Sequence, residues 1–223
     1  MNPVFEQRRH LIPFRATLLS QIFTDVLVIG NGVAGMRAAI EASKHSDVIV
    51  TSKGKLDQSN TYKAQGGIAA VFDEDDTFAS HVADTLAAGA DLCDQSVVKE
   101  VVEAAPKRMQ ELMDWGMRFD RVNKQANGKI ALGREGGHST GRILHADGDA
   151  TGKELARTLD RKMRSSERVR LFDECFVLDL ITLEGGDVSP SQSAGRCVGA
   201  VTYHPKYGLQ VIWANATILA SGG

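Results

Sequence analysis

The chain lacks the residues that would build a disulfide framework or a cysteine-rich metal site. It has only three cysteines in 223 residues, Cys93, Cys175 and Cys197. Their number is odd and their spacing is wide, so they form neither a CxxC pair nor a metal-ligand pattern. Separate thiols are typical of a reducing compartment, and we therefore expect a cytoplasmic protein.

Long apolar runs and an excess of basic charge are also missing. No run approaches the roughly 18 apolar residues that a membrane-spanning helix needs, so we expect no membrane partner. The formal net charge is −2, with both signs mixed along the chain. This distribution offers no basic stripe for nucleic acid. A chain of 223 residues that is 43% hydrophobic suits one large domain, or one and a half, with a substantial core.

We interpret residues 1–23 as an N-terminal extension of a domain that covers residues 24–223. Pro13, Arg15 and Gln21 interrupt the apolar residues of the extension, so it lacks the continuous core of a signal peptide. Its arginine content leaves an organelle transit peptide as the alternative to a segment that packs on the surface.

A glycine motif follows the first predicted strand. The almost wholly apolar run Thr24–Ile29 predicts a parallel strand that is buried on both faces. A helix over residues 36–44 and a second strand over residues 47–50 complete a β-α-β unit. The turn between the first strand and the helix has the pattern GxGxxG and consists of Gly30, Asn31, Gly32, Val33, Ala34 and Gly35.

This turn predicts a dinucleotide-binding site. Gly30 permits the tight turn, Gly32 lets the backbone approach a pyrophosphate, and Gly35 allows close packing of helix and strand. The helix N-terminus supplies N–H groups and a positive dipole end for phosphates. The alternative is a glycine turn that serves packing alone.

An acidic residue is missing where an NAD site would place one. The second strand ends in Val50-Thr51-Ser52-Lys53, without the Asp or Glu that would hold the ribose hydroxyls. This absence disfavours a plain NAD-dependent dehydrogenase. Lys53 either contacts a phosphate or ribose of the cofactor or is a solvated surface lysine.

The rest of the chain alternates between helical and strand-like patterns. We expect helices over residues 77–90, 96–115 and 152–165, with Asp76 or Thr77 capping the first. Pro106 makes the second either two helices or one kinked helix. Polar loops are expected over residues 120–149 and 184–195, and strands in VRLF, FVLDLIT, CVGAVTY, LQVIWA and ATILASGG.

Several longer motifs resemble L-aspartate oxidases, a family in the fumarate reductase/succinate dehydrogenase flavoprotein superfamily. The resemblance extends from residue 24 to residue 223. The motifs are VLVIGNGVAG, VTSKG, NTYKAQGGIAAVF, SHVADTLAAGADLCD, REGGHSTGRILHADGDATG and ILASGG. The resemblance implies an α/β, Rossmann-like FAD-binding domain with a parallel sheet and an antiparallel β-meander.

The resemblance also implies an activity. Family members oxidise L-aspartate to iminoaspartate and pass the electrons to oxygen or fumarate. Iminoaspartate then goes to quinolinate synthase, which makes the oxidation the first step of de novo NAD biosynthesis. Two alternatives stay open: a fumarate reductase or succinate dehydrogenase flavoprotein subunit, and a non-catalytic flavin-binding module.

The segment after the second strand is expected to wrap FAD. Membrane-complex relatives attach FAD covalently to a histidine at the position of Asn60, and an asparagine amide is too weak a nucleophile for that bond. The resemblance therefore implies non-covalent FAD, although Asn60 can also simply cap a turn. The Lys63 side chain can point to solvent. The expected FAD contacts here and at the chain's last strand are Asn60, Thr61, Tyr62, Lys63, Ala64, Gln65, Gly66, Gly67, Ala220, Ser221 and Gly222.

Glu135 is the residue that the resemblance assigns to orienting the substrate. A carboxylate there can pair with the α-ammonium group of an amino acid. The alternative is an ordinary loop carboxylate paired with Arg134. We interpret Arg142 and His145 as residues that order the loop, and leave His138 between loop ordering and substrate contact.

The remaining charged residues suggest no further site. The run Asp73–Asp76 lacks the spaced oxygen ligands of a calcium loop and is interpreted as a solvated turn, so we assign no metal. His10, His45, His81 and His204 are expected to be structural or exposed.

The resemblance implies that the family's capping domain, C-terminal helical domain and catalytic arginine lie beyond Gly223. We therefore assign no catalytic residue to these 223 residues. We expect the chain by itself to bind FAD weakly, if at all, and not to oxidise aspartate.

Overall fold

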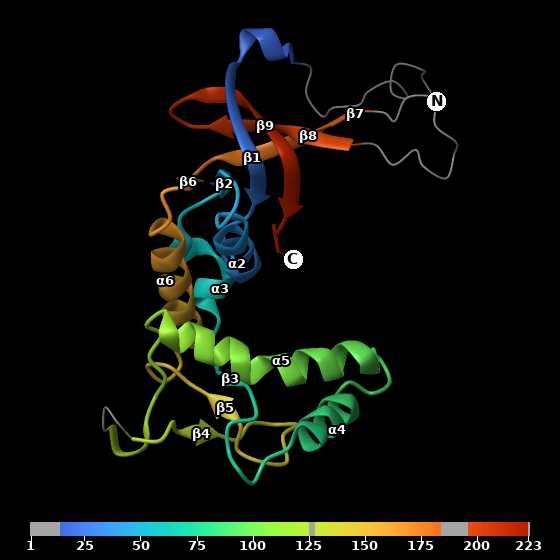
Figure 1. Ribbon diagram of the computed structural model, residues 1–223, viewed down its shortest axis with the longest axis vertical. Helices are drawn as coiled ribbons and strands as arrows, with labels where there is room; N and C mark the ends of the chain where they lie inside the picture. Colours follow the sequence, from blue (N-terminus) through green and yellow to red (C-terminus); the bar gives the residue numbers. More distant parts are fainter. Residues whose placement is uncertain (1–13, 125–127, 184–195, 223) are drawn as a thin grey trace. The chain divides into compact units, whose positions relative to one another are not determined.

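The computed structural model describes residues 14–124, 128–183 and 196–222. Most of the expected N-terminal extension and the expected loop over residues 184–195 lie outside these ranges. The chain forms two compact units (Figure 1). Unit 1 consists of Met1–Asn60 with Asp160–Gly223, and unit 2 of Thr61–Leu159.

Unit 1 is built on a six-stranded sheet in the order β6-β2-β1-β9-β8-β7. Neighbouring strands from β6 to β9 are parallel, whereas β8 is antiparallel to both β9 and β7. The predicted parallel sheet with an antiparallel meander is confirmed. The strands are β1 (Ser20–Ile29), β2 (Val48–Thr51), β6 (Val169–Phe172), β7 (Phe176–Leu183), β8 (Arg196–His204) and β9 (Gly208–Leu219).

The strands β1 and β9 are longer than the sequence patterns predicted. β1 begins at Ser20 rather than at Thr24, because its first residues pair with β9 from Gln210 onward. β9 is one strand where the sequence predicted two. Asn215 interrupts its apolar pattern, but the pairing with β1 continues on both sides of it, with Ala214 opposite Thr24 and Ala216 opposite Val26.

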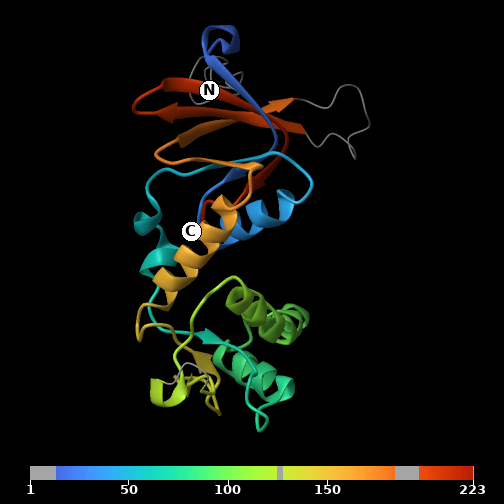
Figure 2. The same ribbon diagram turned by 60° about the vertical axis from the view of Figure 1, so that its left-hand side comes forward.

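The core of unit 1 lies along the middle of this sheet. Leu27, Ile49 and Ile212 belong to one buried cluster, and Val28 is also fully buried. Residues on both faces of β1 are therefore covered, as the apolar run predicted. The helix α2 (Val33–Ala42) contacts β1, β2 and β9 (Figure 2).

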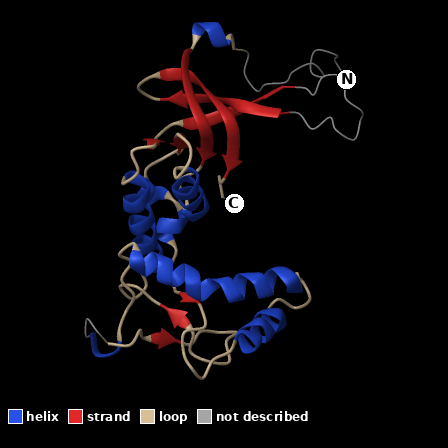
Figure 3. Cartoon of the chain, in the orientation of Figure 1, coloured by secondary structure: helices blue, strands red, loops and turns tan. Residues whose placement is uncertain are grey.

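Unit 2 combines helices with a small antiparallel sheet in the order β3-β5-β4. The helix α5 is a single helix that continues through Pro106 (Figure 3), so the alternative of two helices is wrong. Thr77 caps α4 by accepting a hydrogen bond from Ser80 N, as expected. The bounds are β3 (Ile68–Ala69), α4 (Phe78–Ala88), α5 (Gln95–Asp114), β4 (Leu132–Gly133) and β5 (Ile143–Leu144).

Two helices cross the boundary between the units along the chain. They are α3 (Asn60–Lys63) and α6 (Thr151–Arg164). Within unit 2, the beginning of α6 packs against α3: Gly152 N donates to Ala64 O at 3.2 Å. A Cβ atom on Gly152 would lie 2.3 Å from Thr61 O. The segment that contains Thr61–Ala64 is therefore fixed by a glycine far away in the sequence.

Gly35→Ala should destabilise unit 1, although alanine normally favours a helix over glycine by about 1 kcal/mol. A Cβ atom at Gly35 would lie 1.8 Å from Gly30 O, so the helix would have to move away from the turn. We expect the free energy of unfolding in urea to fall by about 1–3 kcal/mol. Gly136→Ala is the control, because nothing lies within 4 Å of its Cβ position. Equal stability of the two variants would contradict the prediction.

Candidate functional site

In unit 1, the ends of β1, β2 and β9 meet at the glycine turn. Gly30 N donates to Thr51 O, and Ala220 N donates to Ile29 O, both at 2.8 Å. Gly30 has φ +111°, and a Cβ atom there would lie 2.1 Å from Ala220 O. The structure therefore brings Ala220 beside the glycine motif, and the segment up to Gly222 follows directly.

The same turn combines the beginning of a helix with a buried side-chain donor. Gly32 precedes α2 without a side-chain cap, and the first N–H groups of a helix have no intrahelical partners. Asn31 is only 6% exposed, and its Nδ2 has no hydrogen-bond partner among the described residues. A buried donor without a partner costs about 1–3 kcal/mol. These donors suit the pyrophosphate of a dinucleotide.

The other expected cofactor contacts of unit 1 lie at the surface. Lys53 follows β2 and is exposed, and Asn60 is exposed at the beginning of α3. In unit 2, Thr61 and Tyr62 are partly buried, whereas Lys63, Ala64 and Gln65 are exposed. Their contacts with a cofactor remain predictions.

Gly67 has a structural role within unit 2. It precedes β3, whose Ile68 pairs with Leu144 of β5. A Cβ atom on Gly67 would lie 2.3 Å from Ile143 Cγ2 and 2.7 Å from Leu144 O. Close packing on β5 therefore explains this glycine, whether or not a flavin lies beside it.

Glu135 lies beside the glycine pair and contacts His145. His145 Nε2 is 2.9 Å from Glu135 Oε1. The Cβ position of Gly66 is 3.9 Å from the same oxygen. The alternative pairing of Glu135 with Arg134 is wrong, because Arg134 Nε instead donates to His138 O at 3.0 Å. The Glu135 side chain is 49% exposed, so it is open to a ligand.

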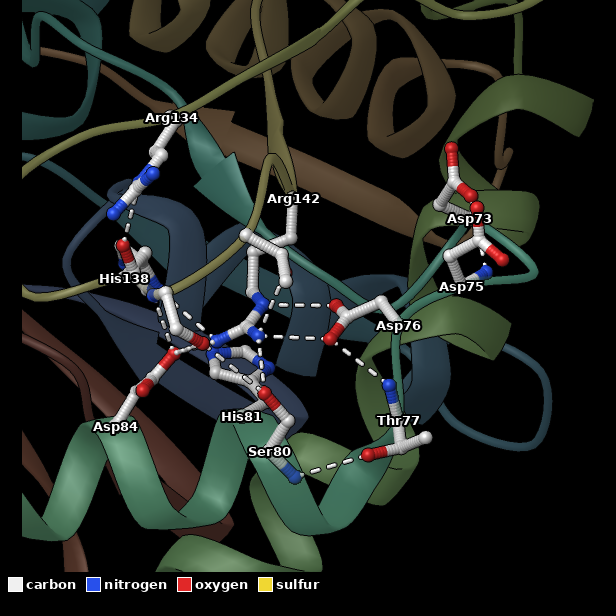
Figure 4. A network of polar contacts seen from close by, with 12 residues as sticks. Asp73, Asp75, Asp76, Thr77, Ser80, His81, Asp84, Arg134, His138 and Arg142 are labelled. Carbon is white, nitrogen blue, oxygen red and sulfur yellow. Dashed lines mark hydrogen bonds and ion pairs between the residues drawn. The ribbon is translucent and has the colours of Figure 1, made fainter.

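A buried arginine network holds the loop that carries Glu135 (Figure 4). Arg142 is fully buried. Its Nε and Nη2 donate to the two carboxylate oxygens of Asp76 at 2.8 Å each. Its Nη1 donates to Asp84 Oδ2 at 2.6 Å. Arg142 therefore ties the loop before β5 to α4 and to the turn before α4, which confirms its loop-ordering role.

The two carboxylates differ in their surroundings. Burial raises the pKa of Asp76, but the hydrogen bonds from Arg142 and from the Thr77 backbone, together with the charge of Arg142, outweigh it, so the pKa lies below its ordinary value. Asp84 Oδ2 accepts hydrogen bonds from the backbone N and the hydroxyl of Ser139 at 2.7 and 2.8 Å. These bonds, followed by the one from Arg142, lower the pKa of Asp84 to about 2. Both groups are therefore anionic at neutral pH.

One expectation about this region is wrong. Asp76 is buried and paired, so only the first three residues of the acidic run form a solvated turn. His81, expected to be structural or exposed, is buried, and its ring centroid lies 5.6 Å from that of His138. Burial lowers the pKa of His81, and the nearby Arg142 cation lowers it further. Sequence reasoning missed this cluster because its members are far apart in the chain.

The described residues offer few other functional features. None of the helices among them is both long and apolar enough to cross a membrane. In the same ranges, no group of three or more His, Cys, Asp and Glu side chains is arranged to hold a metal ion.

Comparisons with known proteins support the dinucleotide-binding site that the glycine turn predicts. A family model described as an FAD binding domain matches residues 25–223. The L-aspartate oxidase of Yersinia pestis is 42% identical over 92% of this chain, which spans 38% of that protein. L-aspartate oxidase 2-a of Nicotiana tabacum, a chloroplastic protein, is 39% identical over 90% of this chain and 30% of its own length.

Solved structures show the same fold. Sdh1 of Mycobacterium smegmatis superposes with a TM-score of 0.80 at 32% identity, over 92% of this chain and 35% of that one. Quinol fumarate reductase of E. coli superposes with a TM-score of 0.79 at 32% identity, over 92% of this chain and 33% of that one. The chain thus spans less than two-fifths of the length of the relatives named here.

Arg142→Met should strongly destabilise unit 2. The change leaves the Asp76 carboxylate, which is 1% exposed, without its cation. We expect a loss of about 3–5 kcal/mol in the free energy of unfolding at neutral pH. Arg164→Met is the control: its pair with Asp160 is at the surface, where such pairs contribute about 0–1 kcal/mol.

The effect of Arg142→Met should also depend on pH. A lowered carboxyl pKa stabilises the folded state above the unfolded value of about 3.9, and this contribution disappears as the pH falls through the folded value. Asp84 keeps its hydrogen bonds from Ser139 in the variant, so the difference arises mainly at Asp76, whose carboxyl pKa Arg142 holds below its ordinary value. The stability gap between wild type and variant should therefore narrow on acidification below pH about 4. If the difference in free energy of unfolding stayed constant as the pH fell, the pairing of Arg142 with the carboxylates would be contradicted.

Proposed function

The chain belongs to the FAD binding domain family, and from this premise we propose that it is the FAD-binding part of an L-aspartate oxidase. The proposed reaction converts L-aspartate to iminoaspartate, with oxygen or fumarate as the electron acceptor. The product would pass to quinolinate synthase in NAD biosynthesis. The similarity to L-aspartate oxidases, at 42% identity to one of them, carries this proposal.

The residues of the glycine turn fit FAD. In unit 1, the beginning of α2 and the unpartnered amide of Asn31 would hold the pyrophosphate. In unit 2, Thr61–Gly67 would contact the rest of the cofactor. Bound FAD supplies the two-electron acceptor for oxidation of an amine to an imine. We propose that it is held without a covalent bond, because Asn60 offers no nucleophile.

Glu135 would recognise the amino group of the substrate. Its carboxylate is half-exposed and lies beside Gly66, so a ligand can reach it. An anionic group there attracts an ammonium ion and gives no benefit to a dicarboxylate that lacks one. Glu135 would thus select L-aspartate over succinate or fumarate. We assign no proton-transferring residue within these 223 residues.

The similarity to Sdh1 and to quinol fumarate reductase supports a second candidate, a flavoprotein subunit of such a complex. Asn60 and Glu135 favour the oxidase. We also propose a reducing, cytoplasmic location, supported by the three cysteines, all of which are free thiols.

Glu135→Gln should impair recognition of L-aspartate. The amide keeps the shape of the side chain but removes the charge that pairs with ammonium. In the protein expressed from its full reading frame, we expect KM for L-aspartate to rise by about tenfold or more, since hydrogen bonds to charged groups contribute about 1.5–3 kcal/mol. Steady-state oxidation of L-aspartate gives KM, and a binding titration gives Kd for succinate. Unchanged KM, or equal weakening of both ligands, would refute the assigned role.

Acid precipitation should release the flavin. Because an asparagine amide cannot form the covalent link, we expect FAD in the supernatant and none in the protein pellet. Absorbance of the two fractions measures this. The complex-type alternative predicts flavin retained in the pellet. If the wild-type protein binds FAD but is not reduced by L-aspartate under anaerobic conditions, the oxidase proposal fails.

A further inference from the structure

We propose that His145 is a positioning residue that holds the Glu135 carboxylate ready for the ammonium group of the substrate. The inference rests on the function proposed above, because it extends the role given to Glu135. His145 Nε2 lies 2.9 Å from Glu135 Oε1. An ionised carboxylate only accepts hydrogen bonds, so Nε2 is the donor in this pair.

The backbone of His145 is fixed by the small sheet of unit 2. His145 directly follows β5, the central strand, which pairs with β3 and β4. Its carbonyl oxygen accepts a hydrogen bond from Asp120 N at 2.8 Å. The ring is therefore attached to a rigid element and not to a freely moving loop.

Two glycines leave the space that the imidazole ring occupies. A Cβ atom on Gly133 would lie 2.8 Å from His145 Cε1, and one on Gly67 would lie 3.0 Å from Cδ2. Both are closer than a ring carbon tolerates without moving. The backbone of Gly67, just before β3, and the backbone of Gly133, in β4, therefore both lie close to the ring. This close packing restricts the rotamers of His145.

Glu135 needs such a partner because its own surroundings do not fix it. Its side chain is 49% exposed, and ordering a glutamate side chain costs up to about 1.5–2 kcal/mol of rotamer entropy. The bond from His145 restrains Oε1. Among the described residues no hydrogen bond to Oε2 is found, so that oxygen is available to a substrate ammonium. A restrained carboxylate with one open oxygen is the arrangement that a positioning residue produces.

His145→Phe tests the inference, because phenylalanine retains an aromatic ring but has no donor. In the FAD-loaded protein expressed from its full reading frame, we expect KM for L-aspartate to rise about tenfold. The Kd of succinate, measured by titration, should stay within twofold. In the Glu135→Gln background, His145→Phe should cause no further loss. His145→Gln, which retains an N–H donor, should recover part of the wild-type KM.

Gly133→Ala provides a second variant that leaves both members of the pair in place. Its Cβ atom would displace the imidazole ring from the position in which it contacts Glu135, so KM for L-aspartate should rise again while the Kd of succinate stays constant. Gly136→Ala is the matched control, because its Cβ position is open, and should behave as wild type. This variant carries the test if His145→Phe does not fold, as judged from its thermal unfolding midpoint.

The outcomes separate the inference from the proposed function. Wild-type protein that oxidises L-aspartate, combined with unchanged KM in His145→Phe and Gly133→Ala, refutes the inference alone. Independent, multiplying effects of Glu135→Gln and His145→Phe refute it as well, because His145 would then not act through Glu135. Equal weakening of succinate points to general structural damage and also overturns it. Wild-type protein that does not oxidise L-aspartate refutes the function, and the inference with it.

Discussion

Both units depend on backbone segments that approach one another more closely than a side chain would allow. In unit 1, Gly35 lies against Gly30 O, and Gly30 lies against Ala220 O. In unit 2, Gly67 lies against Leu144 O. A methyl group on Gly35 would push α2 away from the turn, and one on Gly30 or Gly67 would separate segments that are distant in the chain. The glycines are therefore a geometric requirement of the fold, and a cofactor bound at the glycine turn would use a close approach that the sheet already imposes.

In unit 2, buried ion pairs also hold together segments that are distant in the chain. Loops cannot be fixed by a strand ladder, so the loop that carries Glu135 is fixed by Arg142, whose guanidinium bridges Asp76 and Asp84. Burying these charges is costly, and breaking the pair costs more than forming it gains. Any arrangement of the loop that separated Arg142 from Asp76 would leave a buried charge without its partner, which is costly. That restriction matters for Glu135, which is half-exposed and has little packing of its own.

The sequence predicted the parts of the fold in which local pattern and tertiary structure agree. The apolar run Thr24–Ile29 and its glycine turn were predictable because burial on both faces and the GxGxxG spacing each leave a local signature. The Arg142 network was not predictable, because Asp76 and Arg142 are paired across 66 residues by a loop that has no periodicity. Asp76 adjoins a run of exposed acids and resembled them. A local sequence pattern predicts the structure of residues that are neighbours in the chain. It cannot predict a partner that only folding brings near.

The same limit explains why Glu135 could be placed by resemblance but its partner could not. A carboxylate beside Arg134 suggests a pair by proximity in sequence, yet the strand β5 places His145 closer to it. Because β5 is central in its sheet, the position of the imidazole ring is set by both β3 and β4, and the position of the carboxylate is set by the ring. A change in either edge strand can therefore move the Glu135 carboxylate without touching it, and under the role proposed for Glu135 it would alter substrate recognition. The position of this carboxylate depends as much on the glycines that make room for the His145 ring as on the ring itself.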